Sequence, residues 1–428
     1  MTIKTYDSYK DSGVEWIGKI PSEWKIIKLK YLFNVSKWRN PTEFADENWE
    51  WYSPYLSMDN LRWNAENINY GKISKNSVLV KKWDLLILRD WSNAWEFIKS
   101  KTWILSSTMA VLTNVWLLEN KYAWYFLKVF EKKLKDSTQW MWIPHVDWKI
   151  LKNEWIWFPS SLEQQAIASY LDEKTEVIEN LIKQKKKQIK LLEEKRTALI
   201  NQAVTRWLDP DVELVDSGIE WIGKIPKGWE VITISKMLDG IKDWTHWTHP
   251  RVAVGVPLLS AKNIYTTWID IGNNESCISQ KEHEWIVANW YPKKWDILLT
   301  CVGTIGRSCV YEFDSPYSFQ RSVCFIRLKK KYNQYYVNYF IQTKLYQDQL
   351  DLLSKTSAQS WVYMWDIKKT YIVIPNQIDE QKSISHELDK RINEIIQVEN
   401  KIIETIKLLK EYKKSLISHV VTGKVKVF

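Results

Sequence analysis

Glycine is the residue type that this sequence lacks most clearly. The 428 residues include 12 glycines, whereas ordinary usage of about 7% would give roughly 30. No glycine-rich cofactor loop follows an early strand, no Walker G-x-x-x-x-G-K-[S/T] motif is present, and the pair Gly303 and Gly306 is most simply explained by a turn. The Asn/Asp-Pro-Pro-aromatic motif that adenine methyltransferases need is also absent. These absences predict a chain with no catalytic residues and no cofactor of its own.

Cysteine and long apolar runs are scarce too. The cysteines form no C-x-x-C pair and no metal-ligand spacing with histidine, so we expect buried, reduced thiols and no metal site at Cys277, Cys301, Cys309 and Cys324. No apolar run approaches the ~18 residues of a membrane-spanning helix, and residues 1–10 are too polar for a signal peptide. The sequence therefore predicts a cytoplasmic protein. Lys and Arg total 61 against 51 Asp and Glu, and the net charge of +10 favours a polyanionic partner.

What the chain does contain is a long internal repeat. The stretch SGVEWIGKIPSEW at residues 12–24 returns as SGIEWIGKIPKGW at residues 217–229. Further segments match in the same order: YLSMDNLRW with LLSAKNIYT, KKWDLLIL with KKWDILLT, FPSSLEQQAIASYLD with IPNQIDEQKSISHELD, and LEEKRTALINQAVT with LKEYKKSLISHVVT. We therefore expect a duplicated chain, each half having a mixed, strand-rich globular region and then one long helix.

The end of each half has the pattern of a coiled coil. Apolar residues recur in alternating steps of three and four across 162–206 and 378–422, which contain no Gly or Pro. In the second half this apolar seam is Leu388, Ile392, Ile395, Ile402, Ile406, Leu409, Leu416 and Val420. A helix with one apolar seam must bury it, and the nearest partner is the matching helix of the other half. We expect an antiparallel pair with the globular domains at opposite ends; packing of the helices on other subunits is the alternative.

In their joint order, these motifs resemble the specificity (S) subunit of type I restriction-modification systems, the HsdS family, over essentially the whole chain. In that family an EWIG-x-IP-x-x-W stretch precedes each target-recognition domain, a P…L-x-E-Q…LD stretch opens each conserved spacer helix, and AVTG or AVTRG ends it. The matching residues here are Glu15–Gly18 and Glu220–Gly223, Glu163–Gln165 and Glu380–Gln381, and Ala203–Arg206 and Val421–Gly423.

The resemblance implies a DNA-binding subunit that is not itself an enzyme. Each recognition domain would read one half of a bipartite site in double-stranded DNA. The coiled coil would set the unread spacer and dock two modification (methyltransferase) subunits, with restriction (translocase/nuclease) subunits where the system has them. S-adenosylmethionine, Mg²⁺ and ATP would bind only to those partner subunits.

The expected fold class is α+β, with two tandem α/β target-recognition domains, two long helices paired as an antiparallel coiled coil, and an internal pseudo-twofold repeat. The expected boundaries are 1–160 for the first recognition domain, 161–206 for the first spacer helix, 207–376 for the second recognition domain and 377–424 for the second helix. Two other classes remain open: a fused or stand-alone DNA methyltransferase or nuclease component, and a coiled-coil protein-binding scaffold.

Polar and basic loops supply the candidate DNA contacts. The main ones are KDWTHWTHPR at 242–251, TCVGTIGRS at 300–308, and its first-half counterpart LRDWSNAWEFIKS at 88–100. Arg can bind guanine with two hydrogen bonds, and Asn or Gln can bind adenine in the same way. The candidate residues are Arg39, Ser57, Asn60, Arg89, Ser92, Asn93, Lys242, Thr245, His246, Thr248, His249, Arg251, Ser260, Asn263, Thr304, Arg307, Gln320 and Arg321. For any one of them, ordinary loop polarity is the alternative.

Tryptophan is unusually abundant, with 28 residues against 12 glycines. Many stand where the resembled family has glycine: KKWD occurs twice in place of a Lys-Gly-Asp turn, and AVTRWLD replaces Ala-Val-Thr-Arg-Gly-Leu-Asp. We hypothesise that these codons are UGA, read as glycine by the host. UGA is then expected at Trp83, Trp207, Trp244, Trp247 and Trp295, and UGG at Trp16, Trp24, Trp221 and Trp229.

Overall fold

The computed structural model describes residues 4–15, 17–37, 41–55, 68–75, 77–82, 84–88, 94–106, 108–114, 117–136, 146–206, 211–243, 249–266, 268–272, 274–289, 291–355 and 360–427. The chain folds as two compact units, Met1–Lys185 with Glu404–Phe428, and Lys186–Ile403. Each unit therefore combines one globular domain with parts of both long helices, α4 (Ser161–Arg206) and α10 (Ile378–Val421). No helix in the described ranges is long and apolar enough to cross a membrane.

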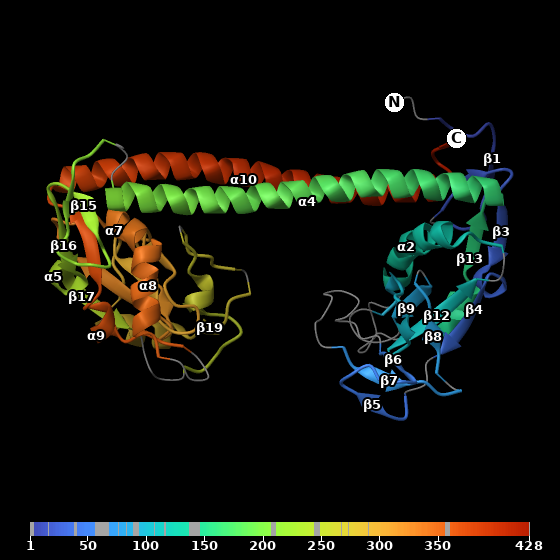
Figure 1. The fold of residues 1–428 in the computed structure, drawn as a ribbon, viewed down its shortest axis with the longest axis horizontal. Coiled ribbons are helices and arrows are strands. Elements are labelled where there is room, and N and C mark those ends of the chain that lie inside the picture. Colours follow the sequence, from blue (N-terminus) through green and yellow to red (C-terminus); the bar gives the residue numbers. More distant parts are fainter. Residues whose placement is uncertain are drawn as a thin grey trace. The chain divides into compact units, whose positions relative to one another are not determined.

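The globular part of the first unit is strand-rich (Figure 1). Its elements are β1 (Tyr9–Asp11), β2 (Lys19–Pro21), β3 (Lys25–Lys28), η1 (Leu29–Tyr31), β4 (Phe33–Lys37), β5 (Phe44–Ala45), β6 (Tyr52–Pro54), β7 (Tyr70–Lys72), β8 (Leu79–Val80), β9 (Leu85–Leu88), β10 (Phe97–Lys99), β11 (Trp103–Ile104), β12 (Met109–Asn114), α2 (Asn120–Asp136), α3 (Trp148–Asn153) and β13 (Trp155–Phe158).

The globular part of the second unit has a closely related element order. Its elements are β14 (Leu214–Asp216), β15 (Lys224–Pro226), β16 (Trp229–Thr233), α5 (Ile234–Met237), β17 (Leu238–Asp243), β18 (Val256–Leu259), η3 (Ala261–Asn263), β19 (Cys277–Ile278), α6 (Gln280–Asn289), β20 (Ile297–Thr300), β21 (Ser308–Val310), β22 (Ser318–Phe319), β23 (Val323–Leu328), α7 (Gln334–Ile341), α8 (Lys344–Leu353), α9 (Met364–Ile367) and β24 (Tyr371–Pro375).

The sequence repeat is matched by a repeat of strand topology. An antiparallel sheet of order β10-β9-β12-β4 in the first unit corresponds to β21-β20-β23-β17 in the second. The repeated Lys-Ile-Pro segments form β2 and β15, and each pairs with the strand before it. The strand before each long helix, β13 or β24, pairs with β3 or β16. The expected α+β class and internal repeat are therefore confirmed.

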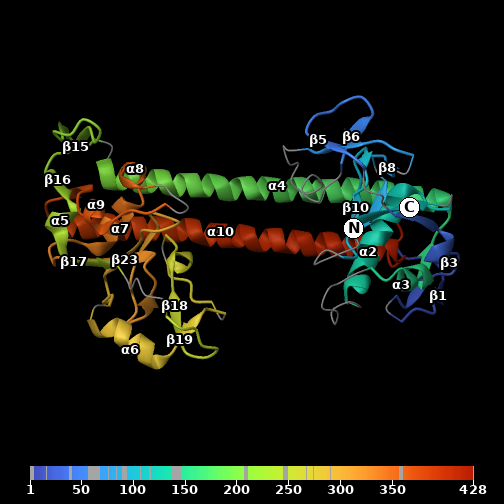
Figure 2. The ribbon, with the colours of Figure 1, turned by 90° about the horizontal axis from the view of Figure 1, so that it is seen from below.

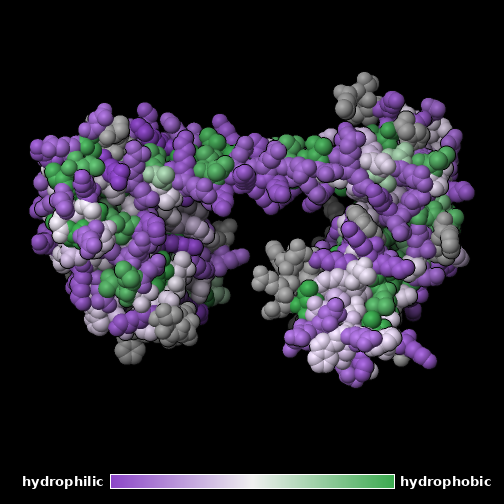
Figure 3. Space-filling view, in the orientation of Figure 1, coloured by the Kyte–Doolittle hydropathy of each residue, from purple (hydrophilic) through white to green (hydrophobic). Residues whose placement is uncertain are grey.

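The apolar seam predicted for the long helices is buried. In α10, six of its eight members are buried and the other two, Leu409 and Leu416, are half-buried. In α4 the matching positions Leu171, Ile178 and Ala203 are buried and Ile189, Leu192 and Leu199 are half-buried. Lys186 and Lys187, which lie outside the seam, are exposed. On the face shown in Figure 3 the long helices are covered mainly by hydrophilic side chains. Burial of one stripe with a polar remainder is what an amphipathic coiled-coil helix requires.

The two helices run antiparallel within each unit, as Figures 1 and 2 both show. In the first unit, Ile167 and Leu171 near the start of α4 share a core with Val421 at the end of α10, and an ion pair joins Glu179 to Lys413. Residues progressively later in α4 therefore lie beside residues progressively earlier in α10. In the second unit, Ala203 near the end of α4 shares a core with Leu388 near the start of α10.

Each globular core includes the end of the helix that follows the other domain. Val420 and Val421 of α10 pack among Ile20, Trp24 and Trp157 of the first unit, and the Trp157 indole N–H donates to the Val421 carbonyl at 2.9 Å. In the second unit Ile200, Ala203 and Val204 of α4 pack with Trp229 and Tyr336, among other residues. The Tyr336 hydroxyl lies 3.1 Å from the Val204 carbonyl oxygen.

The repeated Trp and Glu residues make the same buried contact twice. The indole N–H of Trp24 donates to Glu163 at 3.0 Å, and that of Trp229 donates to Glu380 at 2.9 Å. Both glutamates lie in the first turn of a long helix, where a negative charge is favoured by the helix dipole. The contact ties the opening stretch of each half to the helix that closes the same half.

The neighbouring glutamines, Gln164 and Gln381, form a second matched pair and are both fully buried. Gln164 accepts from the Glu119 N–H at 2.8 Å and donates to the Pro159 carbonyl at 3.0 Å. Gln381 accepts from the Asn333 N–H and donates to the Pro375 carbonyl, both at 2.8 Å. Each glutamine thus joins the chain just before α2 or α7 to the proline that precedes its own helix.

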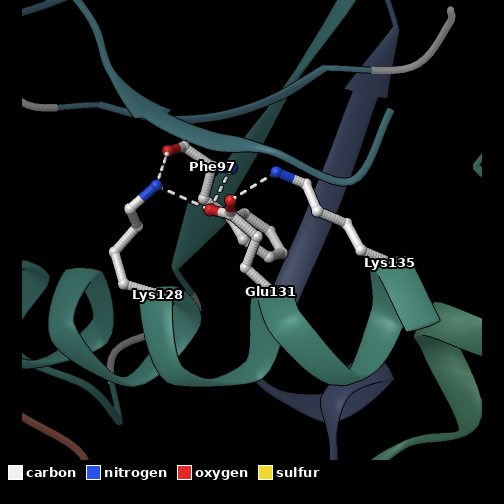
Figure 4. Close-up of polar contacts among 4 residues, drawn as sticks. All are labelled: Phe97, Lys128, Glu131 and Lys135. Atoms are coloured by element: carbon white, nitrogen blue, oxygen red, sulfur yellow. Dashed lines mark hydrogen bonds and ion pairs between the residues drawn. The ribbon is translucent and has the colours of Figure 1, made fainter. Parts of the chain in front are cut away.

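A charged cluster fixes β10 to α2 in the first unit (Figure 4). The Glu131 carboxylate accepts from the Phe97 N–H at 3.2 Å and from Lys128 and Lys135 at 2.6 and 2.7 Å. Burial alone would raise the pKa of Glu131, but the hydrogen bonds and charges of the two lysines outweigh it and hold the pKa below its ordinary value. The cluster therefore joins the strand that follows Glu96 to helix α2.

Replacing Gln381 with Met should lower the free energy of unfolding by about 1–3 kcal/mol, because the buried Asn333 N–H and Pro375 carbonyl lose their partner. Denaturant titration measures the change. The matched control is Gln377→Met, at an exposed position one turn earlier, which should stay within about 0.5 kcal/mol of the parent. Equal effects of the two substitutions would contradict the tie described for Gln381.

Glu131→Gln should destabilise the chain at neutral pH by about 1–3 kcal/mol, since hydrogen bonds to a charged group are lost. Because folding lowers the pKa of Glu131, its contribution is present above the ordinary value of 4.5 and is lost as the pH falls through the folded-state pKa. The difference between parent and variant should therefore shrink in acid, as unfolding curves at several pH values will show. Glu23→Gln, at an exposed site, is the control and should show no such trend.

Candidate nucleic-acid interface

The loop that follows β20 is closed by backbone hydrogen bonds at its base. The Thr300 N–H donates to the Arg307 carbonyl at 2.9 Å, and the Gly306 N–H donates to the Thr300 carbonyl at 3.0 Å. The buried Thr300 hydroxyl also accepts from the Arg307 N–H at 2.9 Å. This closure leaves Thr304 and Arg307 exposed on a short, anchored loop. Two donors of hydrogen bonds on a rigid loop suit the edges of bases better than a mobile loop would.

Two other candidate segments lie against the same loop. The Gln320 N–H donates to the Leu259 carbonyl at 2.7 Å, and the Cys301 N–H donates to the Ser322 carbonyl at 2.9 Å. These bonds bring Ser260, next to Leu259, and the Gln320–Arg321 pair to the edge of the loop. Arg321 is exposed, and Ser260 and Gln320 are half-buried. The structure therefore gathers Ser260, Thr304, Arg307, Gln320 and Arg321 into one surface, which we call the 307 surface.

An aromatic residue that sequence reasoning did not select belongs to the 307 surface. The Arg307 guanidinium lies over the Tyr265 ring, 5.7 Å from its centroid, and Trp268 stacks on the same ring at 4.9 Å. The Gln342 side chain holds this segment by donating to the Thr266 carbonyl at 2.8 Å. A guanidinium resting on a ring loses less freedom when it binds, which suits a recognition side chain. In the sequence, Tyr265 differs from its neighbours only in being one of the two aromatic residues of the segment NIYTTWI at 263–269.

Asn263 lies beside the 307 surface but its side chain faces inward. It is buried, accepts from the Ser260 N–H at 2.9 Å, and donates to the Asp270 carbonyl and the Glu275 carboxylate at 2.8 and 2.9 Å. Both amide donors and the amide oxygen are therefore engaged within the domain. Asn263 thus shapes the turn after β18, and its side chain is turned into the domain interior.

His249 and Arg251 lie at a different part of the second unit. The buried His249 ring forms a 2.7 Å contact with Glu282 in the first turn of α6, and Val252 pairs with Cys277. The His249 ring therefore also serves the domain interior, whereas Arg251 is exposed. Lys242 is exposed on β17, opposite Phe325 of β23. These three residues are not brought into the 307 surface by any described hydrogen bond.

The corresponding loop of the first unit is closed in the same way. The Leu88 N–H donates to the Glu96 carbonyl at 2.9 Å, and the Trp95 N–H donates to the Leu88 carbonyl at 3.0 Å. Its predicted contact residues, however, lie outside the described residues. The same holds for the other candidates of the first half and for three of the second: Arg39, Ser57, Asn60, Arg89, Ser92, Asn93, Thr245, His246 and Thr248.

No group of three or more His, Cys, Asp or Glu side chains in the described ranges is arranged to hold a metal ion. Cys301, Cys309 and Cys324 are buried free thiols and Cys277 is half-buried. Burial raises the pKa of the Cys309 thiol to about 12, so this group stays protonated at neutral pH. The expected burial therefore holds for Cys301, Cys309 and Cys324, whereas Cys277 is only partly covered.

Comparison with known proteins agrees with this arrangement. A family model described as the type I restriction modification DNA specificity domain matches residues 21–191 and 258–408. The chain is 28% identical over 424 residues to the type I restriction enzyme MjaVIII specificity subunit of Methanocaldococcus jannaschii, covering 96% of this chain and 94% of that protein. It is 27% identical over 245 residues to the MjaIX specificity subunit of the same organism, covering 52% of this chain and 53% of that protein.

The fold is also similar to a solved structure. A chain from work on complex assembly and conformational transition of the type I R-M system superposes with a TM-score of 0.69 at 13% identity, covering 94% of this chain and 98% of that one. The first matched stretch contains all four strands of the repeated sheet, and the second contains β20, β21 and β23, whereas β17 precedes it. The chain belongs to the family of the type I restriction modification DNA specificity domain, and it carries that domain twice.

Proposed function

We propose that this chain is the DNA sequence-specificity subunit of a type I restriction-modification complex. The observation that carries the proposal is the repetition of one sheet and one closed loop in two units of a chain from this family. Each domain would read one half of a bipartite site in double-stranded DNA. In the second domain the reading side chains would come from the 307 surface, with Arg307 as the best-supported residue. Lys242 and Arg251, which are exposed cations, would contact phosphates.

The long helices would serve spacing and assembly. Each is continuous, with 46 residues in α4 and 44 in α10, so their length can fix the unread gap between the half-sites. Their exposed faces carry lysines such as Lys186 and Lys187, outside the buried seam. Because the two helices derive from one repeated sequence, they present similar faces to two copies of one modification subunit. Restriction subunits would join the complex where the system has them.

The chemistry would reside on the partners. The sequence has no methyltransferase motif and no nucleotide-binding loop, so S-adenosylmethionine, Mg²⁺ and ATP would bind to the modification and restriction subunits. The chain would act by placing those subunits on a chosen site. A role directed at chromosomal and incoming DNA would locate it in the cytoplasm.

Methyl transfer tests the proposal directly. The purified chain alone, given S-adenosylmethionine and DNA, should methylate nothing, and with its cognate modification subunits it should direct adenine methylation to one bipartite motif. Sequence-specific transfer by the chain alone would instead indicate a fused or stand-alone methyltransferase. Assembly with the partner subunits but no dependence on DNA sequence would indicate a protein-binding scaffold.

Arg307→Ala should relax recognition at one half-site only. Loss of a two-bond contact to guanine costs about 1–3 kcal/mol of discrimination at that position. Competition binding of the assembled complex to sites mutated in either half measures this. Lys330→Ala, an exposed cation elsewhere on the same unit, is the matched control and should leave both half-sites unchanged. If Arg307→Ala weakens binding equally for all sequences, Arg307 contacts phosphate and not a base.

A further inference from the structure

Three described residues other than glycine adopt a left-handed backbone conformation, and all three are tryptophan. They are Trp51 with φ 70°, Trp95 with φ 71° and Trp295 with φ 80°. Among residues with a side chain, Asn and Asp tolerate this region best, whereas a bulky residue there is an outlier. Asn and Asp are plentiful in the chain, but none of those described occupies such a position. Positive φ therefore occurs at tryptophan, a residue type for which this conformation is unfavourable.

Two of these residues hold the same position in a tight turn. The Asp296 N–H donates to the Lys293 carbonyl at 2.9 Å, and the Tyr52 N–H donates to the Trp49 carbonyl at 3.0 Å. Trp295 and Trp51 are the third residues of these four-residue turns, where a type II turn needs positive φ and therefore favours glycine. Their side chains are 47% and 71% exposed, so burial does little to compensate the backbone strain.

The third residue, Trp95, has a glycine as its counterpart in the other half of the chain. The Trp95 N–H donates to the carbonyl of Leu88, and the residue after it accepts from the Leu88 N–H. In the second unit, Gly306 and Arg307 make the same two bonds with Thr300, and Gly306 has φ 87°. The Trp95 indole nitrogen is buried without a hydrogen-bond partner among the described residues. The repeat therefore assigns glycine to this place in the loop.

Three other tryptophans have an ordinary backbone conformation and a hydrogen-bonded indole. The indole N–H groups of Trp24, Trp157 and Trp229 each donate a hydrogen bond within a core or at its border, and none of the three has positive φ. The two groups thus differ in backbone conformation, and Trp95 also lacks the indole hydrogen bond that the second group makes within the described residues.

We propose that positions 51, 95 and 295 are glycine in the protein that the source cells make, each encoded by a UGA codon that those cells translate as glycine. This inference is independent of the proposed function, because it rests on backbone conformation, on the glycine at the matching place of the repeat and on the Trp95 indole, and not on DNA binding. It extends the codon hypothesis for Trp295 to two positions, 51 and 95, that the sequence motifs did not select. With glycine at position 51, the surface of the protein has no aromatic ring at this place.

Peptide mass spectrometry of the chain purified from its source cells tests the proposal. Glycine is expected at positions 51, 95 and 295 and tryptophan at 24, 157 and 229, with UGA and UGG codons respectively in the gene. Tryptophan at any of the first three positions in the native protein would overturn the proposal.

A stability measurement on the chain expressed with the printed sequence gives a second test. Trp295→Gly and Trp51→Gly should each raise Tm, by about 2–5 °C, because a strained residue is replaced by one without Cβ. The matched control is Trp221→Gly, at a side chain that is 49% exposed and has no positive φ, and it should not raise Tm. An unchanged or lower Tm for both turn variants, or an equal rise for the control, would contradict the assignment of glycine.

Discussion

Neither globular domain of this chain has a complete core without the end of the helix that follows the other domain. Val420 and Val421 of α10 belong to the core of the first unit, and Ile200, Ala203 and Val204 of α4 belong to the core of the second. Each long helix therefore starts in the core of its own domain and ends in that of the other. Burying the aliphatic side chains of each helix end contributes several kcal/mol to the free energy of unfolding, at about 1.5–3 kcal/mol for each fully buried Val or Ile. The same packing makes the two helices part of the domains and not linkers between them.

Polar contacts give this apolar packing a fixed register. A helix held only by Leu and Ile can slide or rotate at small cost, whereas a buried Gln or an indole donor has few satisfactory positions. The Trp–Glu pairs and the inward-facing Gln164 and Gln381 supply such contacts at the first turn of each helix. These Trp, Glu and Gln residues are the same in both halves, and they fix each domain on its helix. A reader of DNA needs that rigidity, because its contacts must meet bases at set positions.

The sequence predicted the helices and the seam because both depend on periodic patterns that are local in the chain. It predicted the repeat because matching segments recur in the same order in both halves. It did not predict the exchange of helix ends, because Val420 continues the seam spacing and nothing in its pattern distinguishes a coiled-coil contact from a domain core. In the loops, the polarity of a residue did not indicate whether its side chain faces solvent or the domain interior. Asn263 and His249 resembled Arg307 as candidates, yet hydrogen bonds to Asp270, Glu275 and Glu282 turn the first two inward. The direction of each side chain is decided by where the fold places these partners, which lie 7, 12 and 33 residues further along the chain.

The placement of Val421 in the core of the first unit also has a consequence for the order of events during synthesis. Trp157 and Ile20 leave the ribosome long before the residues that cover them. At about 5–20 residues per second, the end of α10 follows the first domain by roughly 13–50 s. During that interval the first domain carries an open apolar surface where the last turns of α10 will lie. The first part of the chain to be made is therefore among the last to be finished, and its maturation depends on translation reaching the C-terminal helix.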